Sequence, residues 1–214
     1  MYQSILIESQ FLGCIHTYAK IVQYESCQIE KWEHYMKGTY RNRCYIAGAN
    51  GPQRLTVPLV KGKHDHTIIK DIKISYDEDW QRNHWITLYS VYHNSPYFEF
   101  YEDDFAPFFH QKEKYLFDLN EKLMVLLIGL LNIDSKIEST STFEKQVSDD
   151  VLDFRSAIHP NPKKHIKDRD YTELKYKQIF EERTGFLSNM SIVDLLFNLG
   201  PRVLEHLYGS IAPE

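Results

Sequence analysis

Two arginines that flank an asparagine are the side chains best suited to binding an anion. On a strand, residues 41 and 43 of Arg41-Asn42-Arg43 share one face, so both guanidinium groups would point the same way. Two such groups repel each other unless an anion lies between them, and a phosphate or carboxylate fits their fork geometry. We therefore predict that these three residues bind an anionic small molecule. The alternative is that each arginine pairs with an acid such as Glu30 or Glu33.

Three further side chains could supply acid–base chemistry beside that ligand. Glu33 and Tyr35 come shortly before the arginine pair, across a predicted turn, and His84 lies within a helical pattern further along the chain. A carboxylate or phenol in a cleft can accept or donate a proton, and an unperturbed histidine has a pKa of about 6.5. We predict that Glu33, Tyr35 and His84 are catalytic. The alternative places the first two at a solvated strand end and the histidine in the core beside tryptophans.

A third polar group lies near the C-terminus. Asp194 interrupts an apolar run, and Asn198 follows one helical turn later on the same face. A carboxylate in an apolar run costs free energy unless it is paired, so Asp194 must meet an arginine, backbone amides or a ligand. We predict that Gln178 faces the same centre and that all three residues bind the ligand. The equal alternative is a structural role, in which Asp194 pairs with Arg41 or Arg43 or acts as a cap near Ser191.

Other reactive residue types give weaker signals. His64 and His66 lie two residues apart without an evident third ligand, so we predict no metal site. Three cysteines without CxxC spacing indicate a reduced compartment and core positions rather than disulfides or a nucleophile. The sequence lacks GxGxxG, GxxxxGK[ST] and GxSxG motifs and therefore identifies no cofactor.

The apolar pattern predicts the elements that position these residues. The segment Ala49-Asn50-Gly51-Pro52 is a turn signal, so we expect a hairpin that joins residues 43–47 to 55–59. Strands are expected at 4–7, 28–33, 40–47 and 69–75, and helices at 11–22, 79–92, 97–109, 116–131 and 191–199. The predicted fold is α/β: one domain over residues 1–214, with an N-terminal mixed sheet that includes the β-hairpin, followed by C-terminal helices. Polar stretches near 136–150 and 160–172 are predicted to be mobile loops.

Charge and hydropathy narrow the class of partner. The formal net charge is −5 and no basic stripe is evident, which argues against binding to nucleic acid. The most apolar window, residues 123–131, has about half the length of a membrane span, and no signal peptide is evident. We therefore expect no membrane insertion and a cytoplasmic location. The sequence does not predict an oligomeric state.

Three blocks of this sequence resemble the WbqC-like family, in the form common among Bacteroidetes. The first runs from Tyr40 to Pro58, the second from Trp80 to Phe105, and the third from Tyr176 to Pro201. The resemblance implies a role beside enzymes that build O-antigen and other surface polysaccharides. Many relatives carry a His-Gln-Pro motif after the first strand, whereas this chain has Glu8-Ser9-Gln10, so no role of that histidine can be transferred.

Two functional hypotheses follow from the residues and the resemblance. The first is an enzyme of surface-polysaccharide or nucleotide-sugar biosynthesis, a transferase that moves a group to a sugar. The alternative is a non-catalytic module that binds a nucleotide, a sugar-phosphate or a protein partner. A titratable group within hydrogen-bonding reach of the others in one cleft would favour the enzyme.

Overall fold

A four-stranded parallel sheet forms one layer of the protein. The computed structural model describes residues 2–62, 64 and 66–211. The strand order is β5-β2-β1-β6, with β1 at Ser4–Glu8, β2 at Ser26–Glu30, β5 at Lys136–Ser139 and β6 at Val151–Asp153. Every residue of β1 is buried, which explains why this strand reads as a continuous run rather than an alternating one. The α/β class is confirmed.

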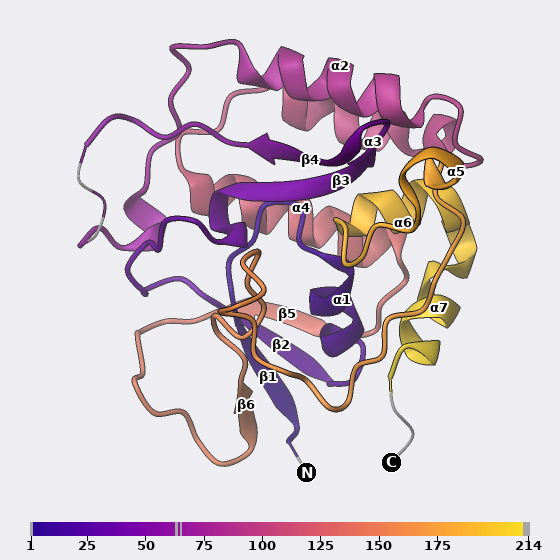
Figure 1. Ribbon diagram of the computed structural model, residues 1–214. Coiled ribbons are helices and arrows are strands. Elements are labelled where there is room, and N and C mark those ends of the chain that lie inside the picture. The colour runs from indigo at the N-terminus through magenta and orange to yellow at the C-terminus, as the bar shows by residue number, and fades with distance from the viewer. Residues whose placement is uncertain (1, 63, 65, 212–214) are drawn as a thin grey trace.

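The predicted hairpin is present and forms a separate antiparallel sheet. Strand β3 (Arg43–Gly48) pairs with β4 (Gly51–Thr56), and Gly51 has a φ of 109° at the turn. The second strand begins four residues earlier than predicted because the connection consists of only two residues. Pro52 is tolerated in β4 because each strand of a two-stranded sheet has a free edge. The hairpin therefore does not extend the parallel sheet, as Figure 1 shows.

The predicted amphipathic helices are confirmed within one or two residues at each end. Their bounds are Trp80–Tyr92 (α2), Phe98–His110 (α3), Leu116–Leu130 (α4) and Ile192–Leu199 (α6), and the chain closes with Val203–Gly209 (α7). A short helix, α5, spans Glu181–Thr184. Figure 1 shows α2 and α3 above the hairpin and the parallel sheet below it, with α6 and α7 at one side.

Three local predictions were wrong. Helix α1 spans only Ile15–Ile21, because Leu12 has a φ of 45°, which an α-helix does not allow. Residues 40–42 form a 3-10 turn, η1 (Tyr40–Asn42), rather than the start of β3. Residues 69–75 begin with another 3-10 turn, η2 (Ile69–Asp71), and make only isolated bridges.

One hydrophobic cluster connects these elements. It includes Ile5 of β1, Ile46 of β3, Leu127 of α4 and Leu207 of α7, so the sheet, hairpin and C-terminal helices share a core. The segments predicted to be mobile contain β5 and border β6, and their mobility stays a prediction.

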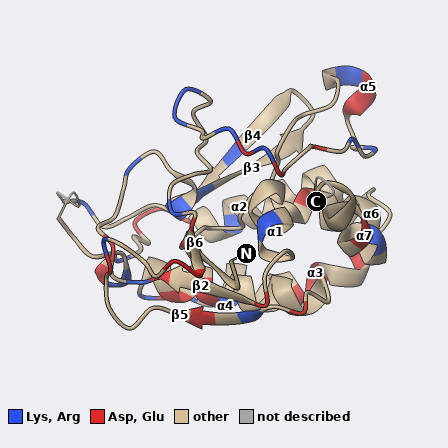
Figure 2. Ribbon diagram, turned by 90° about the horizontal axis from the view of Figure 1, so that it is seen from below, with Lys and Arg blue, Asp and Glu red and all other residues tan. Residues whose placement is uncertain are grey.

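Charged residues are interspersed over the part of the chain that the structure describes. In Figure 2, basic segments alternate with acidic and uncharged ones, and no described element carries an unbroken basic stripe. Among the described helices, none combines the length and apolar character that crossing a membrane requires.

Two glycine-to-alanine substitutions test this packing. Gly200 has a φ of 54°, and an added Cβ would lie 2.4 Å from Tyr97 Cδ1. We expect Gly200→Ala to lower the free energy of unfolding by about 2–4 kcal/mol in urea titrations. The matched control is Gly129→Ala in α4, where an added Cβ meets nothing within 4 Å. It should raise stability by about 0.5–1 kcal/mol, because alanine favours a helix. Equal effects of the two substitutions would contradict the packing described here.

Candidate functional site

A cavity of about 660 Å³ lies between the start of α1, the η1–β3 segment and two C-terminal loops. Its volume falls within the range of small-molecule sites. The orange segment after β6 passes α1 on its way to α5, so two segments far apart in the sequence meet at the cavity (Figure 1). The lining is rich in aromatic and titratable side chains: His16, Tyr40, Tyr45, His159, His165, Lys167, Asp168, Tyr171, Glu173 and Asn189.

His16 and Asp168 form the central polar contact of this cavity. His16 Nε2 lies 2.8 Å from Asp168 Oδ2. Lys20, one helical turn after His16, places its Nζ 3.3 Å from the same oxygen. The Tyr171 ring stacks on the His16 ring with centroids 3.9 Å apart and planes 10° apart. Asn189 Oδ1 accepts the backbone N–H of His16 and so satisfies an unpaired group in the first turn of α1.

The electrostatics of this pair leave the imidazole neutral. Burial lowers the pKa of His16 to about 4 and outweighs the opposing effect of Asp168. For Asp168, burial alone would raise the pKa, but the hydrogen bonds from His16 and the Asp170 amide and the charge of Lys20 lower it overall. At neutral pH the contact is therefore a hydrogen bond from a neutral ring to a carboxylate. Nε2 carries the proton, so Nδ1 is a bare acceptor that can serve as a general base.

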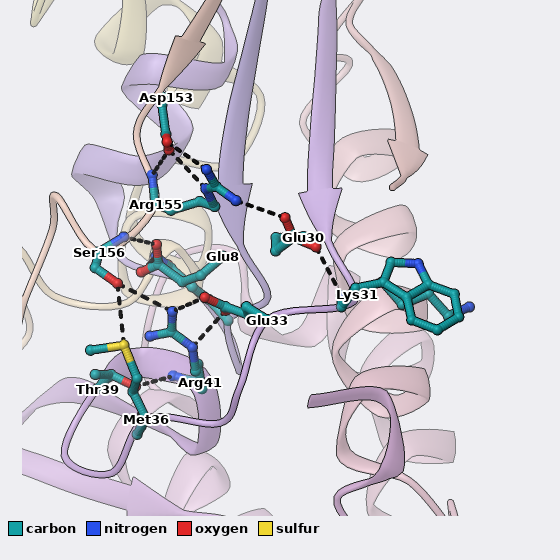
Figure 3. A network of polar contacts seen from close by, with 12 residues as sticks. Glu8, Glu30, Lys31, Glu33, Met36, Thr39, Arg41, Asp153, Arg155 and Ser156 are labelled. Carbon is teal, nitrogen blue, oxygen red and sulfur yellow. Dashed lines mark hydrogen bonds and ion pairs between the residues drawn. The ribbon is translucent and has the colours of Figure 1, made fainter. Parts of the chain in front are cut away.

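A second polar network occupies the carboxyl edge of the parallel sheet. Glu8 and Glu30 are the last residues of β1 and β2 and are paired in register. Arg41 donates from Nε and Nη2 to both oxygens of Glu33 at 2.8 and 2.7 Å. Figure 3 shows Arg41 between Glu33 and Ser156, with Glu8 beside them. Burial alone would lower the pKa of Arg41, but the charges of Glu8 and Glu33 raise it.

This network corrects the prediction for the arginine pair. Arg41 lies in η1 and is fully buried, whereas Arg43 begins β3, so the two do not share one strand face. The structure instead has the pairing of Arg41 with Glu33 that the sequence left as an alternative. Asn42 Nδ2 donates to the Val57 carbonyl at 2.9 Å. The ligand-binding roles of Arg41, Asn42 and Arg43 stay predictions.

The three predicted catalytic residues do not form one constellation. Among the described residues, no hydrogen bond joins His84 to Glu33 or Tyr35. His84 packs against Trp80 with ring centroids 5.2 Å apart, and burial lowers its pKa to about 4. Tyr35 is buried, and burial raises its pKa. None of the three lines the cavity.

Asp194 is the centre of a closed polar cluster in the core. Tyr92 and Tyr176 each donate a phenolic hydrogen bond to its carboxylate at 2.5 Å. Gln178 Nε2 reaches the same carboxylate at 3.4 Å, and Asn198 donates to the Asp194 backbone carbonyl. Burial raises the pKa of Asp194 despite these bonds. Tyrosines therefore take the place of the expected arginine, and none of these side chains lines the cavity.

Sequence reasoning missed His16, Lys20, Asp168 and Tyr171. The signal that was available is the spacing of His16 and Lys20, since two polar residues one turn apart on a buried helix need a partner. Asp168 and Tyr171 lie in a polar segment without periodicity, which gave no such signal. Within the described parts of the chain, no group of three His, Cys, Asp or Glu side chains could hold a metal ion.

Comparison with known proteins gives two matches. The WbqC-like protein family matches residues 9–162. An uncharacterized protein of Mycobacterium tuberculosis is 26% identical over 197 residues, which cover 81% of this chain and 83% of that protein. No solved structure matches.

Breaking the Glu33–Arg41 pair tests how strongly the sheet edge depends on it. Glu33→Gln removes the carboxylate that accepts two hydrogen bonds from the buried guanidinium and leaves only the charge of Glu8 nearby, so we expect the free energy of unfolding to fall by about 3–5 kcal/mol. The double variant Glu33→Gln with Arg41→Met removes both charges and should recover part of this loss. As a control, Asp71→Asn breaks an exposed pair with Lys70 and should cost less than about 1 kcal/mol. A small effect of Glu33→Gln in urea titrations would contradict the role given to this pair.

The two buried histidines predict a pH-dependent stability. His16 and His84 have pKa values lowered from 6.5 to about 4, so below pH 6.5 the unfolded chain binds protons that the folded chain does not. Their stabilisation is present above pH 6.5 and is lost as the pH falls toward 4, by on the order of 3 kcal/mol each. Urea titrations across this window should show a shallower pH slope for His84→Gln than for the wild type. His93→Gln, at an exposed position after α2, is the control for loss of a histidine, and equal slopes for both variants would contradict the assignment.

Proposed function

The chain belongs to the WbqC-like protein family, and from this premise we propose that it is an enzyme of surface-polysaccharide or nucleotide-sugar biosynthesis. The proposed reaction is the transfer of a group to a sugar. The proposed substrate class follows from the family resemblance, and the proposed reaction chemistry follows from the side chains that line the cavity. Because nucleotide-sugars are made in the cytoplasm, we propose that the protein acts there.

The observation that carries this proposal is the neutral His16 ring, held by Asp168 at the wall of a ligand-sized cavity. In the proposed step, a sugar hydroxyl gives its proton to His16 Nδ1 while its oxygen bonds to the transferred sugar carbon of a nucleotide-sugar donor. The bond from that carbon to the phosphate oxygen breaks, and the nucleoside diphosphate leaves with the electron pair. Asp168 stabilises the positive charge that then develops on the ring, and the hydrogen bonds from His16 and the Asp170 backbone N–H, together with Lys20, keep Asp168 ionised. The stacked Tyr171 ring fixes the imidazole plane.

The aromatic lining suits a sugar. Tyr40 and Tyr45 contribute to the same cavity wall and present flat apolar rings with polar tips. The apolar C–H face of a pyranose can pack against such a ring while its hydroxyls remain free to form hydrogen bonds.

A binding module without catalysis is the second candidate, and the composition of the cavity rim favours it. Residues 161–171 carry Lys163, Lys164, Lys167 and Arg169, and Lys167 lines the cavity. Asp168 and Asp170 in the same segment offset two of these charges, and the remaining excess of positive charge attracts an anionic ligand whether or not a reaction follows.

A ligand screen followed by turnover tests both candidates. The purified protein is first heated with nucleotides, nucleotide-sugars and acyl-CoA species. A ligand at a hundredfold excess over its Kd adds about 2.7 kcal/mol of stability, which is a readable rise in Tm. For a ligand that binds, we expect His16→Gln to lower kcat by about 10²–10⁴-fold, the usual contribution of a general base. Binding should change far less.

The control for this experiment is His93→Gln, which removes an exposed histidine outside the cavity and should leave turnover unchanged. Ligand binding without turnover in the wild type would favour the binding module. Full activity of both His16→Gln and Asp168→Asn would contradict the assignment of His16 and Asp168 as the catalytic pair.

A further inference from the structure

Two histidines on the loop side of the cavity use one ring nitrogen each to shape that loop. The backbone N–H of Asn161 donates to His159 Nδ1 at 2.8 Å, and the backbone N–H of His159 donates to His165 Nδ1 at 3.4 Å. A ring nitrogen that accepts an N–H carries no proton of its own, so the proton of each neutral ring sits on Nε2. The backbone therefore fixes both tautomers.

Both Nε2–H groups are left as available donors. In the described part of the chain, neither Nε2 has a hydrogen-bonding partner, and both rings line the cavity. Lys167 also lines the cavity, and no ion pair of the described residues includes it. Three residues of the lining thus carry two ring N–H donors and one ammonium group without a partner among the described residues.

The two acidic side chains that line the cavity, Asp168 and Glu173, form hydrogen bonds with other residues. Asp168 accepts from His16 and lies beside Lys20, and Glu173 accepts the backbone N–H of Asn189. No hydrogen bond or ion pair among the described residues joins either carboxylate to His159, His165 or Lys167. His16 differs from the other two histidines, because Asp168 holds its Nε2–H and leaves Nδ1 as an acceptor.

We propose that His159, His165 and Lys167 bind the phosphate or pyrophosphate group of the ligand. A phosphate group offers several oxygens that only accept hydrogen bonds, which matches a wall of donors. The inference rests on the proposed function, since it names the chemical class of the donor at the same cavity. The rings of His16 and His165 lie 5.4 Å apart, so the proposed base and the phosphate-binding donors face one small molecule from adjacent positions.

Isothermal titration with inorganic pyrophosphate tests the proposal, and histidine-to-asparagine substitution gives a matched variant. The asparagine Oδ1 takes the place of Nδ1 and still accepts the backbone N–H, but the Nε2 donor is gone. We expect the wild type to bind pyrophosphate and the double variant His159→Asn, His165→Asn to bind at least tenfold more weakly. The reciprocal double variant to glutamine keeps a donor near the Nε2 position and should bind within about threefold of the wild type. His93→Asn is the control for loss of a histidine elsewhere.

A second measurement avoids dependence on how the variants fold. In the wild type, pyrophosphate should shift the ring ¹⁵N resonances of His159 and His165 and leave those of His93 unchanged. No binding to the wild type, no shift of these resonances, or full affinity in a folded double asparagine variant would each overturn the proposal.

Uridine diphosphate and inorganic phosphate are titrated in parallel to identify the source of the phosphate. Binding of uridine diphosphate that is lost in the asparagine variant supports a nucleotide donor. Binding of inorganic phosphate or pyrophosphate without uridine diphosphate would assign the wall to a free phosphate and overturn the link to a donor. If pyrophosphate does not bind but His16→Gln still abolishes transfer, this inference fails while the proposed function stands.

Discussion

A fully buried guanidinium must have its charge balanced, and the contacts of Arg41 that meet this requirement organise the centre of the molecule. The Arg41 guanidinium donates to the carboxylate of Glu33, which follows β2. Its Nη2 also donates to Ser156, which follows β6. The Ser156 amide donates in turn to Glu8 at the end of β1. Three strand ends are thereby connected to η1, and the residue before Arg41 is Tyr40, which lines the cavity. The same contacts that hold the sheet edge together thus fix one wall of the candidate site.

The residues that line the cavity come from different parts of the chain. His16, Tyr40, Tyr45 and His159 lie within the segment that matches the family, residues 9–162, whereas Asp168, Tyr171 and Asn189 lie beyond it. The proposed base therefore belongs to the matched segment, while the carboxylate that sets its tautomer and the ring that stacks on it belong to the remainder. The chemistry of His16 depends on both segments.

Local sequence patterns were enough to predict the long helices, the hairpin and the need of Asp194 for partners. Periodicity located α2, α3, α4 and α6 because each buries one face, and Asn50-Gly51 located the hairpin turn because glycine adopts a positive φ there. The same patterns misplaced the start of α1 and residues 40–42. At both places the backbone or side chain contacts a distant segment that no local pattern reveals: Ser191 Oγ donates to the Leu12 carbonyl, and Arg41 Nη2 donates to Ser156.

The candidate site itself was beyond local reasoning. His16 and Asp168 are 152 residues apart, and neither the polarity nor the spacing of residues 160–172 indicates that this loop closes over α1. The partners of Asp194 show the same limit, because the need for hydrogen bonds was evident but the two tyrosines that supply them were not. Burial of a polar residue can be inferred from its neighbours, whereas the identity of its partner depends on the fold.

The residues that line the cavity lie far apart in the sequence, and this has a consequence for biosynthesis. The parallel pairing of β1 with β2 and the β3–β4 hairpin use only the first 56 residues, so these pairings can form while the chain is still being made. The cavity additionally needs Asp168, Tyr171 and Asn189, which leave the ribosome well after these pairings can form. A prematurely terminated product could therefore contain these early pairings and still have no ligand site, so that incomplete chains would not compete with finished ones for substrate.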